Sequence, residues 1–389
     1  MLTFKAFTGI NNVQPPERLS DSALVRATDV DIGLTGELSR RAGFSEASDL
    51  CHKNLHQADG FMLATVDGGD LVSILPGGAR TVLLDSLGAD RVWYCNLPDG
   101  RVAFSNGLIH GMARQNSSTS WSVPAPESVG MLAVTSGGLH KGRYAYYLTH
   151  VRASDGLEGP PTMAAPAEVE GGILLMGLPQ LEGHSTNVYL SGANGEGAYL
   201  AGNTAATDFM FGGSNTQLTL PCRTMGLSAA PVGTVMAFWR GRVLVAQGGT
   251  LWASMPHAPH LFDLRRDFKQ MGSRITLVQP VDSGVYVGTD QDLFYLGGEQ
   301  FDALVLQAKS LGPVVLGSGV KAPGASIKLG DGVGSGTAML CIAGGHVVAG
   351  FNGGQAHAMT DGVYRTAADE VAATFREMDG IPQYLAVPQ

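Results

Sequence analysis

Tight glycine turns between short runs of apolar residues are the feature that most restricts how this chain can fold. The clearest case is the segment 231–263, PVGTVMAFWRGRVLVAQGGTLWASMPHAPHLFD. In it, an alternating run at 243–246 reaches Gly248-Gly249, and a second run begins at Leu251. The two central residues of a tight antiparallel turn need positive φ, which glycine adopts without steric cost. The segment therefore predicts a β-hairpin.

The same turn chemistry recurs along most of the sequence. Asp99-Gly100 and Asn106-Gly107 separate three short apolar runs between 92 and 112, a meander typical of a β-propeller blade. Glycine accounts for 54 of 389 residues, about twice its usual share, which indicates many turns between short strands. With blades of about 40 to 45 residues, we predict an all-β propeller of five to seven degenerate blades. Its two parts are residues 51–130 and 231–389.

Residues 131–230 have a different character. An aromatic run at 144–151 is followed by turns at Asp155-Gly156 and Gly159-Pro160-Pro161. Apolar runs at 173–178, 187–190 and 198–200 then follow at the spacing of a two-sheet sandwich. The segment resembles a fibronectin type III-like or immunoglobulin-like module, although it has no Cys-Trp-Cys core. We predict a β-sandwich inserted into the propeller.

The first 50 residues are predicted to form an extended N-terminal arm. Pro15-Pro16 stiffens the chain and excludes a helix there, while Ser20 or Asp21 is placed to cap one short helical turn. Alternating residues on either side of Thr35-Gly36 predict a small hairpin that ends at Arg40-Arg41. These two arginines face either an acidic partner or solvent.

One helix is expected near the other end of the chain. Val371, Phe375 and Met378 are spaced i, i+4 and i+7, as on one face of a helix. Ala368-Asp369 comes just before this run. The spacing therefore predicts a short helix after residue 369.

Charge and cysteine usage narrow the classes of function. The formal net charge of −9 argues against a surface that grips nucleic acid, whereas an acidic channel would let nucleic acid pass without sticking. The N-terminal sequence lacks the apolar core of a signal peptide, and the longest apolar run, 173–178, is too short to span a membrane. No CxxC spacing occurs, so each cysteine is expected to be a small buried hydrophobe: Cys51, Cys95, Cys222 and Cys341.

Three stretches are candidates for a nucleotide-binding loop, a metal site or a charged contact surface. The run 330–336, GDGVGSG, fits neither a dinucleotide fingerprint nor a P-loop, so we predict a loop or turn. His257 and His260 stand beside prolines without a nearby third ligand, which favours an irregular loop over a metal site. A basic cluster is interleaved with aspartates and predicts a solvated face, with an inter-subunit salt-bridge strip as the alternative: Arg265, Arg266, Lys269 and Arg274.

Signatures of catalytic propellers are missing from the sequence. Residues 116–121, NSSTSW, have the serines and tryptophan of a sialidase Asp box but no aspartate, and the motif does not repeat. No G-x-S-x-G nucleophile elbow occurs either. The sequence therefore predicts no catalytic, cofactor-binding or metal-binding residues.

Three segments, taken in order, carry a family resemblance. The first runs from Phe7-Thr8-Gly9 through PPERL at 15–19 and ATDVDI at 27–32 to GELSRRAG at 36–43. The second is GRVLVAQGGTLWASMPHAPHLFD at 241–263, and the third is SGVYVGTDQDLFYLGG at 283–298. Together they resemble tail nozzle, or tail hub, proteins of tailed bacteriophages, especially short-tailed ones. Trp252 and Phe262 of the second segment are interpreted as blade-packing residues.

The resemblance implies a β-propeller protomer in a closed ring, typically a hexamer, below the portal and its adaptor. DNA would leave through the channel without sequence-specific binding, and a tail fibre, needle or plug protein would dock underneath. Such a chain would be assembled in the bacterial host cytoplasm and located in the virion tail, with no enzyme activity, cofactor or membrane span. Assembly contacts are expected from arm residues: Phe7, Pro15, Pro16, Arg18, Leu19, Arg40 and Arg41.

Two other classes of function stay open from the residues alone. One is a propeller glycosidase or lyase that acts on surface polysaccharide. The other is an extracellular propeller that binds carbohydrate or protein. The missing Asp boxes count against the enzyme, and the missing signal peptide counts against the extracellular protein.

Overall fold

The computed structural model describes residues 6–33, 35–43, 45–88, 90–329, 332–378 and 380–389. Within these ranges the chain consists of β-strands, loops and short 3-10 turns, without an α-helix, so the predicted all-β class is confirmed. No helical segment there is long and apolar enough to cross a membrane. The 3-10 turns are η1 (Pro16–Arg18), η2 (Asp67–Gly69), η3 (Asn215–Gln217), η4 (Gly324–Ser326) and η5 (Asn352–Gly354).

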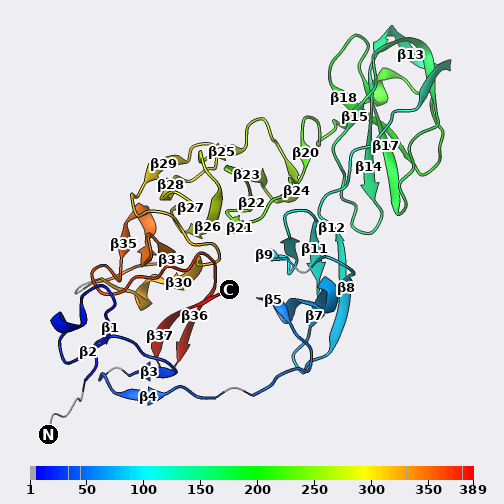
Figure 1. Cartoon of the computed structure of the whole chain (residues 1–389). Coiled ribbons are helices and arrows are strands. Elements are labelled where there is room, and N and C mark those ends of the chain that lie inside the picture. The colour runs from blue at the N-terminus through cyan, green and yellow to red at the C-terminus, as the bar shows by residue number, and fades with distance from the viewer. Residues whose placement is uncertain (1–5, 34, 44, 89, 330–331, 379) are drawn as a thin grey trace.

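Five antiparallel sheets stand around a common centre as the blades of a β-propeller (Figure 1). The first blade is β5 (Lys53–Gln57), β6 (Met62–Val66), β7 (Asp70–Ile74) and β8 (Arg80–Leu84). The second is β9 (Trp93–Asn96), β10 (Val102–Ser105), β11 (His110–Arg114) and β12 (Ser117–Ser120). The third is β21 (Met236–Trp239), β22 (Arg242–Gln247), β23 (Thr250–Met255) and β24 (Ala258–Phe262), with β20 (Ser228–Ala229) and β25 (Phe268–Gln270) added.

The fourth and fifth blades follow in sequence order. The fourth is β26 (Ile275–Val281), β27 (Gly284–Thr289), β28 (Leu293–Gly297) and β29 (Val305–Ala308). The fifth is β30 (Val320–Pro323), β33 (Thr337–Ala343), β34 (His346–Gly350) and β35 (Ala356–Ala358). The predicted run 330–336 lies partly outside the described residues; its described part includes β32 (Gly332–Val333), which pairs with β31 (Lys328–Leu329).

A separate hydrophobic core joins each pair of neighbouring blades. Phe61 and Phe104 belong to the core between the first and second blades, and Trp121 and Phe262 to the core between the second and third. Trp252 packs against that second core, so the interpretation of Trp252 and Phe262 as packing residues is confirmed. Two further cores join the third blade to the fourth and the fourth to the fifth. Alternating strand residues supply both faces of each sheet, which explains why little of the sequence is charged.

The sixth position around the centre holds a hairpin, β36 (Val371–Met378) and β37 (Ile381–Pro388). The helix predicted after residue 369 is therefore wrong. A spacing of four residues fits a strand as well as a helix, and it places Val371 and Phe375 on the same face of β36. Phe375 lies opposite Tyr384, and both pack against the core of the fifth blade.

The last hairpin meets the start of the propeller through Arg91, which lies in the connection between the first two blades. Its guanidinium pairs with the carboxylate of Glu370 and donates to the carbonyl of Val371 at 3.3 Å. The described residues form no hydrophobic core between this hairpin and the first blade. We call this junction the seam.

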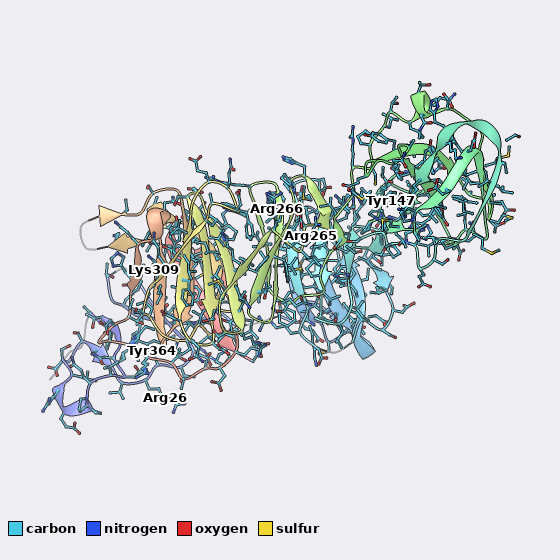
Figure 2. The ribbon with its side chains drawn as sticks, turned by 90° about the horizontal axis from the view of Figure 1, so that it is seen from above. Arg26, Tyr147, Arg265, Arg266, Lys309 and Tyr364 are labelled. Carbon is cyan, nitrogen blue, oxygen red and sulfur yellow. The ribbon has the colours of Figure 1, made fainter. Side chains whose placement is uncertain are left out.

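The inserted β-sandwich stands between β12 and β20 and projects from one end of the molecule (Figures 1 and 2). One sheet is β13 (Met131–Tyr144), β16 (Ala167–Met176) and β19 (Phe209–Phe211). The other is β15 (Thr162–Met163), β14 (Tyr146–Arg152), β17 (His184–Ser191) and β18 (Ala198–Thr204). The aromatic run predicted as one strand is broken at Ala145, where the chain passes from one sheet to the other. Tyr144 and Tyr146 both enter the core between the sheets.

The arm lies at the opposite end of the molecule, next to the fifth blade (Figures 1 and 2). It contains β1 (Gly9–Ile10), which pairs in parallel with β2 (Ala23–Leu24), and a hairpin of β3 (Val30–Ile32) and β4 (Leu38–Arg40). The helical turn predicted after Ser20 is wrong because Ala23 and Leu24 pair with β1. A 3-10 turn forms at Pro16 despite the prediction, since proline is tolerated at the first helical position.

The four cysteines are unpaired, and three of them are buried as predicted. Cys51 is exposed, which corrects the expectation for that residue. It lies in the extended segment between β4 and β5, where few neighbours surround the chain.

Loss of the Tyr286 hydroxyl should destabilise the contact between the fourth and fifth blades. This fully buried hydroxyl lies 2.8 Å from the carbonyl oxygen of Phe351 and 2.7 Å from that of Gln355. We expect Tyr286→Phe to lower the free energy of unfolding by about 1–2 kcal/mol, measured by urea denaturation. Tyr364→Phe, at a partly exposed site, is the control and should change it by less than about 0.5 kcal/mol. Equal effects of the two variants would contradict this role.

Candidate assembly site

Among the described residues, Asn12 attaches the arm to the segment that follows β35 of the fifth blade. The side chain of Asn12 donates to the carbonyl oxygen of Arg365 at 2.7 Å and accepts from the Arg365 amide at 2.8 Å. The Asn12 amide also donates to the carbonyl of Val363 at 3.1 Å. An asparagine amide reproduces the donor and acceptor of a peptide group, so Asn12 extends backbone pairing onto the propeller. Nothing local in the sequence marks Asn12, because its partner is distant in sequence.

The predicted assembly residues fall into two groups within the arm. Phe7 donates its amide to the carbonyl of Gly36 at 2.8 Å, which joins the start of the arm to the β3–β4 turn. Arg18 and Leu19 line a cavity of about 300 Å³ between β1, β2 and Val363. Pro15 and Pro16 stand exposed at the turn beside it.

The other two predicted residues lie on the β3–β4 hairpin. Arg41 is paired with Asp31, with its Nη2 and Nε atoms 3.1 and 3.2 Å from the carboxylate. Arg40 is exposed on β4, and its side chain makes no hydrogen bond or ion pair with the described residues. The structure therefore gives Arg41 a role within the hairpin and leaves Arg40 directed to solvent.

The hairpin is connected to the propeller by a long exposed segment. Residues 41–52 form no helix or strand in their described part, and most of them are exposed. Figure 1 shows this segment crossing from the arm to the first blade. Its few contacts leave the arm as a separate element held mainly by Asn12.

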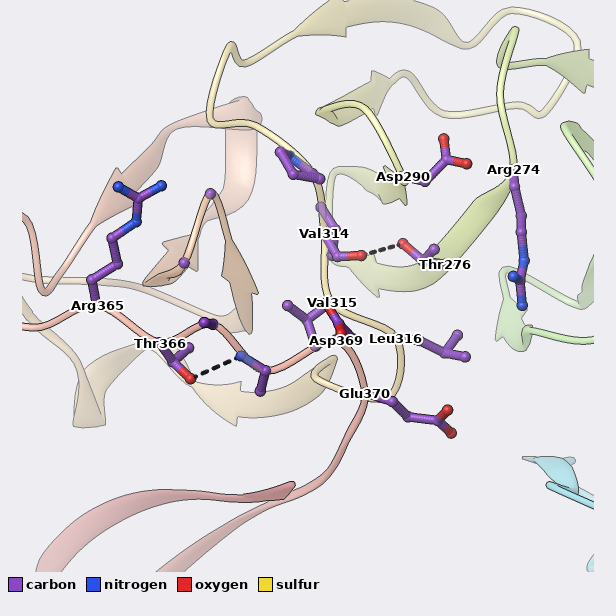
Figure 3. Close-up of a pocket in the computed structure, with 15 residues that line it drawn as sticks. Arg274, Thr276, Asp290, Val314, Val315, Leu316, Arg365, Thr366, Asp369 and Glu370 are labelled. Carbon is purple, nitrogen blue, oxygen red and sulfur yellow. Dashed lines mark hydrogen bonds between the residues drawn. The ribbon is translucent and has the colours of Figure 1, made fainter. Parts of the chain in front are cut away.

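A cavity of about 850 Å³ lies between the fourth and fifth blades (Figure 3). Its lining carries both signs of charge, with Arg274 and Asp290 from the fourth blade side and Asp369 and Glu370 before β36. The Thr276 hydroxyl donates a hydrogen bond to the carbonyl oxygen of Val314 at 2.8 Å. This hydroxyl is therefore not free to act as a nucleophile. No group of three or more metal-ligating side chains occurs in the part of the chain that the structure describes.

The basic cluster from the sequence is dispersed by the fold. Arg265 pairs with Asp263 at 3.2 Å, and Lys269 donates to the carbonyls of Asp302 and Leu304. Arg274 lines the large cavity instead of joining them. Figure 2 shows Arg265 and Arg266 at the surface of the propeller. The cluster is mostly engaged within its own chain.

The junction between sandwich and propeller is buried and polar. Arg152 pairs with Asp155 at 2.9 Å and donates to the Ser120 carbonyl at 2.8 Å. Nearby, the Trp121 indole donates to the carbonyl of Pro259, and Ser122 donates to that of His260. The bond to Ser120 joins the sandwich to the second blade, and the bonds of Trp121 and Ser122 join the segment after β12 to the third blade.

His257 and His260 do not share an irregular loop as predicted. His257 occupies a tight turn with φ of 58°, and His260 is a buried residue of β24. Burial, together with the positive charges of Arg101 and Arg152, lowers the pKa of His260 to about 4. Proline at 259 is tolerated because β24 lies beside an irregularity in its pairing with β23.

An apolar face on the sandwich was not anticipated as a surface. The outer side of the β13–β16–β19 sheet carries Met131 and Met210, 67% and 68% exposed, beside Leu174 and Met176. The continuous apolar run at 173–178 indicates this face in the sequence, because it supplies apolar residues to both faces of β16. Methionine-rich surfaces adapt readily to protein partners.

Stability should depend on pH through His260. The pKa of His260 is about 4 in the folded state and about 6.5 in the unfolded state. Between pH 6.5 and pH 4, the unfolded chain therefore binds a proton at this residue that the folded chain does not bind. The free energy of unfolding should not change through His260 above pH 6.5. Below pH 6.5 it should decrease by up to about 1.4 kcal/mol per pH unit, the value for one proton. His260→Gln should reduce this dependence in denaturant titrations, whereas His140→Gln, at an exposed position, should leave it unchanged. Parallel curves for the native chain and His260→Gln would exclude this origin.

Comparison with known proteins finds only solved structures of low similarity to this chain. No family model matches the chain, and no curated protein matches it in sequence. Solved structures that are similar include the WD40 domain of Neurospora crassa Pan2, with 10% identity, 87% of this chain and 85% of that chain covered, and a TM-score of 0.34. The Dos1 propeller has 8% identity, coverages of 92% and 79%, and a TM-score of 0.36. At such values these similarities support no conclusion about activity or partners, and the propeller assignment rests on the sheets described above.

Proposed function

We propose that this chain is a structural subunit of a phage tail nozzle, a ring through which DNA leaves the particle. The supporting observation is that the residues of the N-terminal signature build an arm. Phe7 binds the hairpin turn at Gly36, Arg41 pairs with Asp31, and Arg18 and Leu19 line the arm cavity. A signature that shapes an arm suits a subunit that must engage neighbours.

The remaining features fit this role. An acidic chain with net charge −9 repels phosphate and suits a channel that DNA passes without binding. The outer sandwich face offers an apolar surface for a fibre, needle or plug protein. In this proposal the portal adaptor lies above the ring, the chain assembles in the bacterial cytoplasm, and it acts in the virion tail without catalysis.

The proposal is tested by the assembly state of the purified chain. Negative-stain images and native mass measurements should show sixfold rings with a central pore. Removal of residues 1–45 should leave a folded all-β propeller, checked by circular dichroism, that no longer forms rings. Asn12→Ala should weaken ring formation because it detaches the arm, whereas Gln14→Ala, an exposed neighbour, should not.

Three results would contradict the proposal in different ways. Unimpaired rings from the truncated chain would exclude the arm as the assembly element. A monomer that cleaves a surface polysaccharide would replace the nozzle by a propeller enzyme, and a monomer that retains glycan without cleavage would indicate a binding propeller. The 850 Å³ cavity would be the first place to look for either activity.

A further inference from the structure

The sixth position of the propeller is two strands short. Each of the five preceding blades has at least four strands, but β36 pairs only with β37 in the described structure. β36 contacts β30, the first strand of the fifth blade, so β36 occupies the inner position. The outer side of β37 therefore faces the space that two further strands fill in the other blades.

The orientation of backbone groups on β37 follows from two hydrogen bonds. Gln389 donates its amide to the Glu370 carbonyl, so odd-numbered residues of β37 point toward β36. Val371 donates away from β37, to the Leu316 carbonyl, which agrees with this register. Even-numbered residues thus face the free edge. Tyr384 and Ala386 offer amides there, and Pro382 and Pro388 offer none.

The free edge is consequently short and defined. Two amides stand between two prolines, and the prolines keep a longer strand from pairing along the whole edge. Val387, 59% exposed, lies next to these amides as an uncovered apolar side chain. The edge suits a strand of about three residues.

The chain has such a strand in the arm. Arg41 donates to the Asp29 carbonyl and Gly33 to that of Glu37, so odd-numbered residues of β4 point toward β3. Leu38 and Arg40 therefore direct their amides and carbonyls outward, and Leu38 is 39% exposed. Two outward residues on β4 match the two outward amides on β37.

We propose that the outer edge of β37 accepts the β3–β4 hairpin of a second copy of this chain. The copies then complete one another's sixth blade by β-strand addition. This inference rests on the ring proposed above, in which identical head-to-tail contacts close a cycle.

A second copy fits better than the chain's own hairpin. Within one chain, Phe7 holds Gly36 and Asn12 holds Arg365, and no bridge joins β3 or β4 to β37 in the described residues. In Figure 1 the hairpin runs across the end of β36–β37 instead of along β37. Most of the described residues of the segment 41–52 are exposed, and no strand pairs with the outward edge of β4 in the described residues.

Cross-linking between differently labelled molecules tests the proposal. In a Cys51→Ser background, which removes the exposed thiol, one protein carries Arg40→Cys and a second, of different mass, carries Ala386→Cys. A short bismaleimide should join the two proteins when they are mixed. Moving the first cysteine to exposed Ser154, on the sandwich, should abolish the product.

The edge itself is tested by Ala386→Pro, which removes one outward amide without removing a bond to β36. We expect roughly fivefold weaker association or more, with an unchanged melting temperature. Ala386→Thr keeps the amide and should associate normally.

Each outcome separates this inference from the proposed nozzle. Rings without the cross-link would overturn the edge pairing and leave the nozzle standing, as would a chain with both cysteines that cross-links only within itself. Cross-linked pairs without rings would uphold the pairing and count against the nozzle. If neither rings nor the cross-linked product form, both the edge pairing and the nozzle are contradicted.

Discussion

Closure of the propeller takes place at the seam, where the described residues share no apolar core. Elsewhere neighbouring blades share a continuous apolar core, but the last hairpin meets the first blade through Arg91, Glu370 and the carbonyl of Val371. An exposed ion pair of this kind contributes much less than a buried apolar interface. The C-terminal hairpin is fixed mainly from its other side, where Phe375 and Tyr384 pack on the fifth blade. In the proposed pairing of copies, β37 beside this seam is also the strand that joins one copy to the next.

Much of the fold could be predicted because turns and strands leave local signals. Gly248-Gly249 and the alternating residues around it set the hairpin of the third blade regardless of what packs on it. The C-terminal strands could not be predicted in this way, since Val371 and Phe375 fit both a helix and a strand until Tyr384 is placed opposite. Asn12 was missed for a similar reason, because the partner that gives it meaning is Arg365. Blade number depends on such long-range pairing, and the sequence alone allowed five to seven.

The arm and the sandwich extend the propeller in opposite directions (Figure 2). The sandwich is joined to the second blade by the buried Arg152, whereas the arm is attached by Asn12 and a long exposed segment. The sandwich presents its outer face to a partner, and the arm, with its few contacts to the propeller, is open to a neighbouring copy. This division is what we expect of a subunit that has to join a ring and also carry another protein, as in the proposed nozzle.

Hydrogen–deuterium exchange of the isolated chain tests the seam most directly. Amides of β36 and β37 should exchange markedly faster than those of β27 and β33, which lie between apolar cores on both sides. Arg91→Ala should accelerate exchange in β36 and β37 and leave the third blade unchanged. Uniform protection of all six positions, unaffected by Arg91→Ala, would show that the propeller is closed by some other interaction and would contradict the role assigned to the seam.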